Sequence, residues 1–167
     1  MTLELRRPLA AEAVPPGGRE VLVEANPAEC AVLARRMGLP ALLSLNCAFR
    51  LIPVRSGVIA AEGHLKARLV QICVVTLEEF ETELDERFTV RFLPQGTERD
   101  DPDPDAEDEI PYHGGVLDLG EAAAEQLALG LDPYPRKPDA VLPPTGSEQD
   151  EEAVGPFAGL VGLKPPP

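Results

Sequence analysis

Basic residues are scarce in this sequence. Its 167 residues include 15 Lys and Arg against 29 Asp and Glu, which gives a formal net charge of −14. Affinity for the phosphate backbone comes largely from Lys and Arg side chains that displace condensed counterions, so this charge disfavours non-specific binding of RNA or DNA. The same charge would attract basic proteins or simply keep the protein in solution, and composition does not separate these two roles.

Long apolar runs are missing as well. Residues 1–18 contain no continuous apolar core of a signal peptide. Nowhere does the chain approach the roughly 18 consecutive apolar residues that a membrane-spanning helix needs. We therefore expect a cytoplasmic protein.

Cysteine and histidine are few. The chain has three widely spaced cysteines, Cys30, Cys47 and Cys73, and two histidines, His64 and His113. An odd number of distant thiols suits reduced cysteines better than a disulfide framework, and the lack of a Cys-x-x-Cys pair excludes a redox dithiol. Structural zinc requires four Cys or His ligands in close pairs, so we expect no metal and no cofactor.

The sequence shows no catalytic constellation. Nucleophilic catalysis needs a Ser, Thr or Cys beside a base that a third group orients. His64 alternates with basic residues on a predicted solvated face and His113 lies in a loop, so we interpret both as surface residues. Gly114–Gly115 lacks the further glycine and lysine of a phosphate-binding loop, and helix capping explains Asp118 and Glu121. We predict no catalytic residue and no enzyme.

Proline is abundant, with 19 residues in a chain whose length suits one domain. We predict a single domain over residues 1–131 with an acidic, disordered linker at 96–109 inside it. Residues 132–167 are predicted to form a Pro-rich, largely disordered tail that ends in a short apolar docking segment.

The first part of the chain predicts two strands and a helix. Residues 3–5 and 19–24 have the alternating or β-branched character of short strands. Asn26 as a cap, proline at the next position and Glu29 reaching back to the cap predict the start of a helix. Gly38 is a natural stop for that helix.

Three long strands are predicted next. Apolar residues at every second position from Leu43 to Leu51 indicate a half-buried strand with Cys47 in the core. A strand over 58–75 follows, with a slip in phase after Leu69 that predicts a bulge or burial on both faces. The third strand, over 80–92, begins after a turn near residues 76–78. In the strand over 58–75, the residues expected to point inward after the slip are Val70, Ile72 and Val74.

These patterns together predict an α+β fold. Long consecutive strands joined by short turns pair antiparallel, so we expect a curved antiparallel β-sheet or barrel-like meander with two or three helices. One of these helices is predicted after Asp118, which resembles its cap, with strong helix formers over 122–131. Its Leu127 and Leu131 could pack on the sheet or on another molecule.

Charged residues on the solvated face allow two interpretations. Basic and acidic side chains of neighbouring strands could form cross-strand ion pairs, which is the interpretation that we favour. Alternatively, Arg50, Arg55, Lys66 and Arg68 could form a local basic patch that contacts RNA or a partner. Surfaces that read RNA usually add exposed aromatic rings, whereas the phenylalanines of these strands are predicted to point inward.

Three segments carry a family resemblance. Residues 73–80, 117–135 and 157–164 resemble the motifs of the YceD-like family of large ribosomal RNA subunit accumulation proteins, in the same order and at similar spacing. The first resembles the pattern Cys-x-x-Cys-Leu-Glu-x-Phe and the last resembles Pro-Phe-Ala-x-Leu-x-x-Leu-Lys. The similarity covers residues 40–164. The matching residues are Cys73, Leu77, Glu78, Phe80, Asp118, Leu119, Glu125, Gln126, Leu127, Phe157, Leu160, Leu163 and Lys164.

The resemblance implies a bacterial, non-catalytic factor that supports synthesis, processing or accumulation of large-subunit (23S) ribosomal RNA. Thr76 stands where many relatives have a second cysteine and residues 136–139 lack the cysteines of some members, so a structural zinc site is not expected. The expected partner is a basic ribosomal protein, a processing nuclease or a large-subunit precursor, and neither DNA nor a membrane. Direct RNA binding is the alternative. The segment Phe157–Lys164 is expected either to cap the sheet or to dock on the partner.

Overall fold

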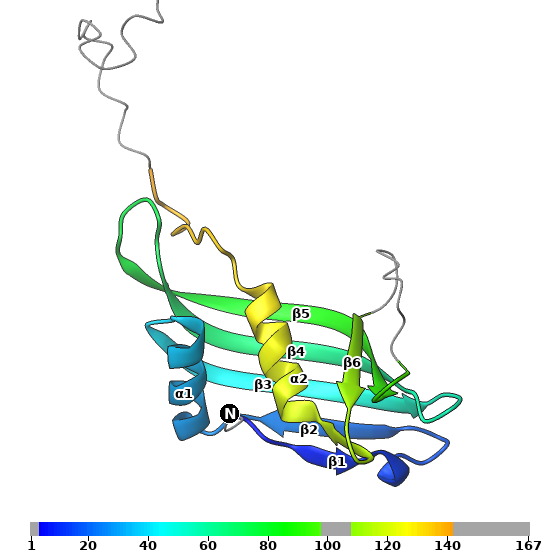
Figure 1. The fold of residues 1–167 in the computed structure, drawn as a ribbon. Helices are drawn as coiled ribbons and strands as arrows, with labels where there is room; N and C mark the ends of the chain where they lie inside the picture. Colours follow the sequence, from blue (N-terminus) through cyan, green and yellow to red (C-terminus); the bar gives the residue numbers. More distant parts are fainter. Residues whose placement is uncertain (1–3, 98–107, 142–167) are drawn as a thin grey trace, which may run out of the picture.

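The structure is a computed structural model that describes residues 4–97 and 108–141 (Figure 1). In chain order its elements are β1 (Pro8–Ala10), the 3-10 turn η1 (Ala11–Ala13), β2 (Arg19–Glu24), α1 (Pro27–Met37), β3 (Ala41–Pro53), β4 (Ile59–Ile72), β5 (Glu79–Pro94), β6 (Asp108–Tyr112), β7 (Val116–Asp118) and α2 (Leu119–Gly130).

The main sheet has five strands in the order β2-β3-β4-β5-β6. Strands β2 to β5 form the predicted antiparallel meander, while β6 pairs parallel with β5 and β1 pairs with β7 in a separate small sheet. The α+β class is confirmed, but the described strands form an open, mixed sheet and not a closed barrel. A period of two in the sequence reports burial and not strand direction, so it could not predict the parallel β6.

Helix α1 begins and ends as the sequence predicts. The Asn26 side chain accepts a hydrogen bond from the Glu29 backbone N–H at 2.9 Å, and the Glu29 carboxylate accepts one from the Asn26 N–H at 2.8 Å. This reciprocal pair satisfies two donors that the first turn of a helix leaves without partners. Gly38 ends the helix in the left-handed region, with φ of 67°.

Helix α2 lies across one face of the main sheet (Figure 1). Its Leu119 and Leu127 are fully buried, and the small side chains of Ala122–Ala124 let the helix approach the strands closely. Leu131, just after the helix, is partly buried against the core. Of the two predicted packing modes, the structure shows packing on the sheet, and the helix starts at Leu119, directly after the predicted cap Asp118.

Two strand predictions near the ends of elements were wrong. Glu4 and Leu5 lie in a bend, although Leu5 is buried, and the first strand is β1. In β3 the pairing shifts between Leu42 and Ser44, so Leu42 points into the core and Leu43 is 45% exposed. Because one extra residue reverses the faces of a strand, this irregularity moved the inward position by one.

The predicted slip of phase in β4 is absent. Gln71 and Cys73 remain on the buried side, while Ile72 and Val74 are exposed. Regular pairing with β5 continues as far as Ile72 opposite Glu79, so the pleat keeps its register even though the inward position is a glutamine. The Gln71 amide compensates for its burial by donating to the backbone carbonyl of Asp132 at 3.3 Å.

The predicted linker and tail are only partly described. Asp108 and Glu109, predicted to end the acidic linker, instead start β6, while residues 98–107 and 142–167 lie outside the described residues. The proposed division at residue 131 stays a prediction. Residues 132–141 are described, and they contact the turn between β4 and β5.

Candidate functional site

The first predicted motif is the turn between β4 and β5, which is built around a buried sulfur. The Cys73 Sγ accepts hydrogen bonds from the backbone N–H groups of Val75, Thr76 and Lys137, each at 3.4 Å. The Val74 N–H also donates to the Pro135 carbonyl at 2.9 Å. The turn therefore holds a segment that lies more than 60 residues further along the chain.

These donors shift the acidity of the thiol. Burial of the Cys73 sulfur raises its pKa, but the N–H of Lys137, the hydroxyl and N–H of Thr76 and the N–H of Val75 outweigh burial and lower the pKa to about 7. The predicted core cysteine behaves in the opposite way, because burial raises the pKa of Cys47 to about 12. Burial also raises the pKa of Cys30. All three thiols are free.

Leu77 and Glu78 complete this turn. Leu77 has φ of 60° and is 78% exposed, while its N–H donates to the Cys73 carbonyl at 2.8 Å. The Glu78 carboxylate pairs with the Lys137 ammonium at 3.2 Å. Phe80, the last residue of the motif, is partly exposed on β5. The motif thus joins the turn to residues 135–137. It also leaves the apolar side chain of Leu77 exposed to solvent.

The second predicted motif forms the start of α2. The Asp118 side chain accepts hydrogen bonds from the N–H groups of Gly120 at 3.1 Å and Glu121 at 3.3 Å, as expected for a cap. It also accepts one from the Arg7 N–H at 3.0 Å. Glu121 forms an ion pair with Arg36 at 2.7 Å. The capping residue therefore also fixes the N-terminal strand.

The remaining residues of this motif divide between core and surface. Leu119 and Leu127 are buried, Gln126 is half-buried and Glu125 is exposed. Although Glu125 as a whole residue is exposed, partial burial of its carboxyl group and the nearby charge of Glu121 raise its pKa. The third predicted motif, with Phe157, Leu160, Leu163 and Lys164, lies outside the described residues.

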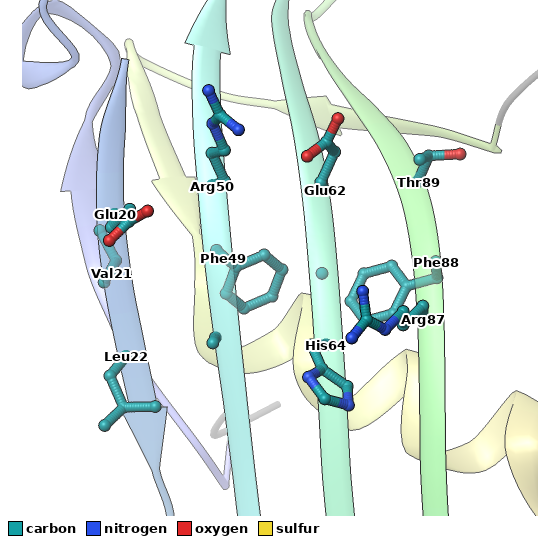
Figure 2. A pocket seen from close by; sticks show the side chains of 12 residues that line it. Glu20, Val21, Leu22, Phe49, Arg50, Glu62, His64, Arg87, Phe88 and Thr89 are labelled. Atoms are coloured by element: carbon teal, nitrogen blue, oxygen red, sulfur yellow. The ribbon is translucent and has the colours of Figure 1, made fainter.

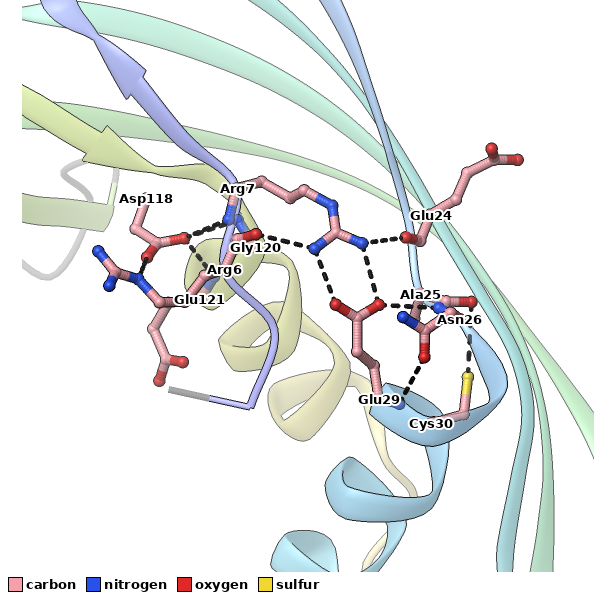
Figure 3. Close-up of polar contacts among 10 residues, drawn as sticks. All are labelled: Arg6, Arg7, Glu24, Ala25, Asn26, Glu29, Cys30, Asp118, Gly120 and Glu121. Atoms are coloured by element: carbon pink, nitrogen blue, oxygen red, sulfur yellow. Dashed lines mark hydrogen bonds and ion pairs between the residues drawn. The ribbon is translucent and has the colours of Figure 1, made fainter. Parts of the chain in front are cut away.

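An ion-pair network links α1 to the N-terminal strand (Figure 3). The Arg7 guanidinium binds both carboxylate oxygens of Glu29, each at 2.9 Å, and also donates to the Glu24 carbonyl at 2.6 Å. The hydrogen bond from Arg7 is the main reason why the pKa of Glu29 is lowered. Sequence reasoning found Glu29 only as a helix cap, because nothing local in the sequence links it to Arg7.

The outer face of the main sheet, opposite α2, carries the predicted charged strands. Lys66 pairs with Asp85 at 3.5 Å, and Arg68 pairs with Glu81 at 3.0 Å and Glu83 at 3.8 Å. His64 contacts the same Asp85 at 2.6 Å. The predicted cross-strand ion pairs are therefore present. They involve Lys66 and Arg68, two of the four cations of the predicted basic patch.

A shallow hollow of about 840 Å³ lies on this outer face (Figure 2). Arg50 lines it, in register with Glu20 and Glu62 on the neighbouring strands. Arg87 lines the same hollow, and neither arginine forms an ion pair with a residue of the described chain. Alternation along β5 puts Arg87 on this face, but only the tertiary structure brings it to the hollow that Arg50 also lines.

The four predicted cations do not form one patch. Arg55 lies in the turn between β3 and β4 and does not line the hollow. Arg50 lies in the hollow, while Lys66 and Arg68 are paired to β5. The local charge of the outer face is therefore mixed and not basic.

Both histidines and all three cysteines lie within the described ranges, 4–97 and 108–141. Within them no group of three or more His, Cys, Asp and Glu side chains is placed to hold a metal. His113 contacts the Gln95 side chain at 2.7 Å on the surface. No helix in this part of the chain is both long and apolar enough to cross a membrane.

These observations define an α+β protein whose curved, mixed sheet is covered by helices on one face and open on the other. The family model described as large ribosomal RNA subunit accumulation protein YceD matches residues 61–164, more than half of the chain. The protein belongs to this family, which confirms the resemblance. The description of the family gives it a role in the accumulation of large-subunit ribosomal RNA and names no enzymatic activity. No curated protein and no solved structure matches the chain significantly.

Proposed function

We propose that this protein is a non-catalytic ribosome-biogenesis factor of the bacterial cytoplasm. It supports the synthesis, processing or accumulation of 23S ribosomal RNA by binding a basic ribosomal protein, a processing nuclease or a large-subunit precursor particle. The observation that carries this proposal is the family match over residues 61–164, which includes the Cys73 turn and the start of α2.

The distribution of charge supports a protein partner over bare RNA. The net charge of −14 repels phosphate, and Lys66 and Arg68 already contact carboxylates of β5. A phosphate group would have to displace these carboxylates to reach the two cations. A basic protein would instead be attracted by the exposed carboxylates.

Two measurements test the proposal. In cells that lack the gene, we expect the ratio of 23S to small-subunit ribosomal RNA to fall, and the full-length protein should restore it. The tagged full-length protein should also retain its partner after ribonuclease treatment of the extract. An unchanged RNA ratio would contradict the role in accumulation, and loss of every partner on ribonuclease treatment would contradict the protein-partner mechanism.

Direct RNA binding is a second candidate, because Arg50 and Arg87 line one hollow and form no ion pair with the described chain, although Glu20 and Glu62 line the same hollow. Titration of the purified protein with a large-subunit RNA fragment at several salt concentrations separates the two mechanisms. Binding through these arginines would weaken steeply as salt increases, since each phosphate contact releases counterions. The protein-partner mechanism predicts no binding of the fragment even at low salt.

A further inference from the structure

An apolar groove lies at one end of the main sheet, between the loop after α1, the end of β4 and the segment after α2. Its volume is about 380 Å³. Among the described residues that line it, Asp132 is the one that carries a charge. The apolar lining includes Met37, Leu39, Pro40, Ile72, Leu131 and Pro133.

Exposed apolar side chains continue this groove onto the Cys73 turn. Ile72 is 46% exposed, Val74 45%, Leu77 78% and Tyr134 71%. The hydrogen bond between Val74 and Pro135 keeps the turn and the segment after α2 together. Exposed apolar side chains that gather beside an apolar groove often mark a contact with another segment or molecule.

We propose that this groove binds residues 157–164 of the same chain. Phe157, Leu160, Val161 and Leu163 supply apolar side chains, and the one charged residue of the segment is Lys164. A single cation in the segment therefore matches the single carboxylate, that of Asp132, in the groove. This complementarity favours the segment over an acidic peptide.

The length of the connecting chain also favours an occupant from the same molecule. The last described residue, Val141, follows the groove-lining Pro135 by only six positions. The chain between Val141 and Phe157 can span up to about 50 Å. It is therefore long enough for Phe157 to reach the groove at this end of the sheet. Tethering of this kind gives an effective concentration of order millimolar, which a separate molecule rarely reaches in solution.

The absence of tryptophan from the chain provides a direct test in the full-length protein. F157W introduces a single tryptophan into the segment, and V154W introduces one just before it. We expect the emission of F157W to be shifted to the blue and shielded from acrylamide relative to V154W. Equal emission and equal quenching in the two variants would overturn the proposal.

A second pair of substitutions tests the location of the binding site. I72K places a charge in the groove, and because Ile72 lies opposite Glu79, the new ammonium can pair with that carboxylate across β4 and β5. I52K is the matched control, because Ile52 is a 37% exposed strand residue of the outer face that does not line the groove. Melting temperatures of both variants establish that the fold is retained.

The location is supported if I72K abolishes the blue shift of F157W and I52K leaves it unchanged. A blue shift that survives I72K would place the segment elsewhere and overturn the proposal. A blue shift that disappears on dilution would assign the contact to a second copy and would also overturn it. None of these outcomes depends on a ribosomal partner, so the test is independent of the proposed function.

Discussion

At the scale of single residues, Leu77 combines strain with exposure. A left-handed backbone costs an ordinary L-residue about 1–2 kcal/mol, and an exposed side chain recovers little of that cost by burial. The hydrogen bonds around Cys73 hold this conformation. Leu77 therefore keeps a strained backbone conformation because the hydrogen bonds of the surrounding turn hold it there.

Glycine at position 77 should release this strain. We expect Leu77→Gly to leave the free energy of unfolding unchanged or to raise it by up to about 1 kcal/mol, since glycine adopts positive φ readily. Leu129→Gly is the control, because Leu129 is similarly exposed at 72% but lies in α2, where glycine costs about 1 kcal/mol. Urea denaturation measures both, and equal losses of stability would contradict the role of strain.

The Cys73 thiol should make stability depend on pH. Its pKa in the folded protein is about 7, below the ordinary value of 9.0, so the unfolded chain holds the proton more tightly. The resulting stabilisation is complete above about pH 9 and is lost as pH falls through about 7. We expect the difference in stability between wild type and Cys73→Ser to grow as pH rises from about 6.5 to about 8.

Cys47→Ala is the control for this titration. Because the pKa of Cys47 is raised to about 12, its thiol stays protonated in the folded state over that range. The loss of stability from this substitution should therefore be nearly constant across it. If the Cys73→Ser difference were equally constant, the hydrogen bonds to sulfur would not stabilise a thiolate.

At the scale of elements, α2 is fixed by a close approach at its first turn. A Cβ atom on Gly120 would overlap the backbone carbonyl of Leu5, which cannot move as a side chain could. We expect Gly120→Ala to destabilise the protein by about 2–3 kcal/mol, even though alanine is the better helix former. Gly17→Ala is the matched control, since nothing lies within 4 Å of its Cβ position. Thermal unfolding that ranks the two variants equally would contradict this contact.

The link between α1 and the N-terminal strand can be isolated by one substitution. In Glu29→Gln the amide oxygen can still accept from the Asn26 N–H, but the charged pair with Arg7 is lost. Since both side chains are partly exposed, we expect a loss of about 1 kcal/mol. Glu24→Gln should change stability by less, because Arg7 contacts the Glu24 backbone and not its carboxylate. Denaturant titrations of the two variants compare them, and equal effects would show that Arg7 contributes nothing measurable.

At the scale of the whole molecule, the arginines of the outer face allow the proposed protein partner to be distinguished from bare RNA. We expect Arg50→Gln with Arg87→Gln to leave ribonuclease-resistant association with a partner unchanged, because the proposed contact depends on exposed carboxylates and not on these arginines. An RNA-binding surface would respond differently. In an RNA-binding protein the double substitution would lower the affinity for every RNA sequence. The slope of log affinity against log salt concentration would also become less steep, by the equivalent of about one phosphate contact per arginine. Affinity purification of the double variant and salt titration with RNA distinguish these outcomes.

Local signals in the sequence determined much of the architecture. The Asn26 cap with Glu29 and Gly38 set both ends of α1, and alternation predicted the buried sides of the central strands. Such signals involve neighbours within a few positions, so they act before distant contacts form. The family motifs around Cys73 and Asp118 were likewise visible in the sequence.

Only the tertiary structure decided which distant residues meet. It brought Lys137 to the Cys73 sulfur, Arg7 to Glu29 and Arg87 into the hollow with Arg50. It also made β6 parallel and kept Gln71 inward where local hydrophobicity favoured a slip. Strand register and long-range hydrogen bonds depend on how the whole chain packs, and no short pattern encodes that packing.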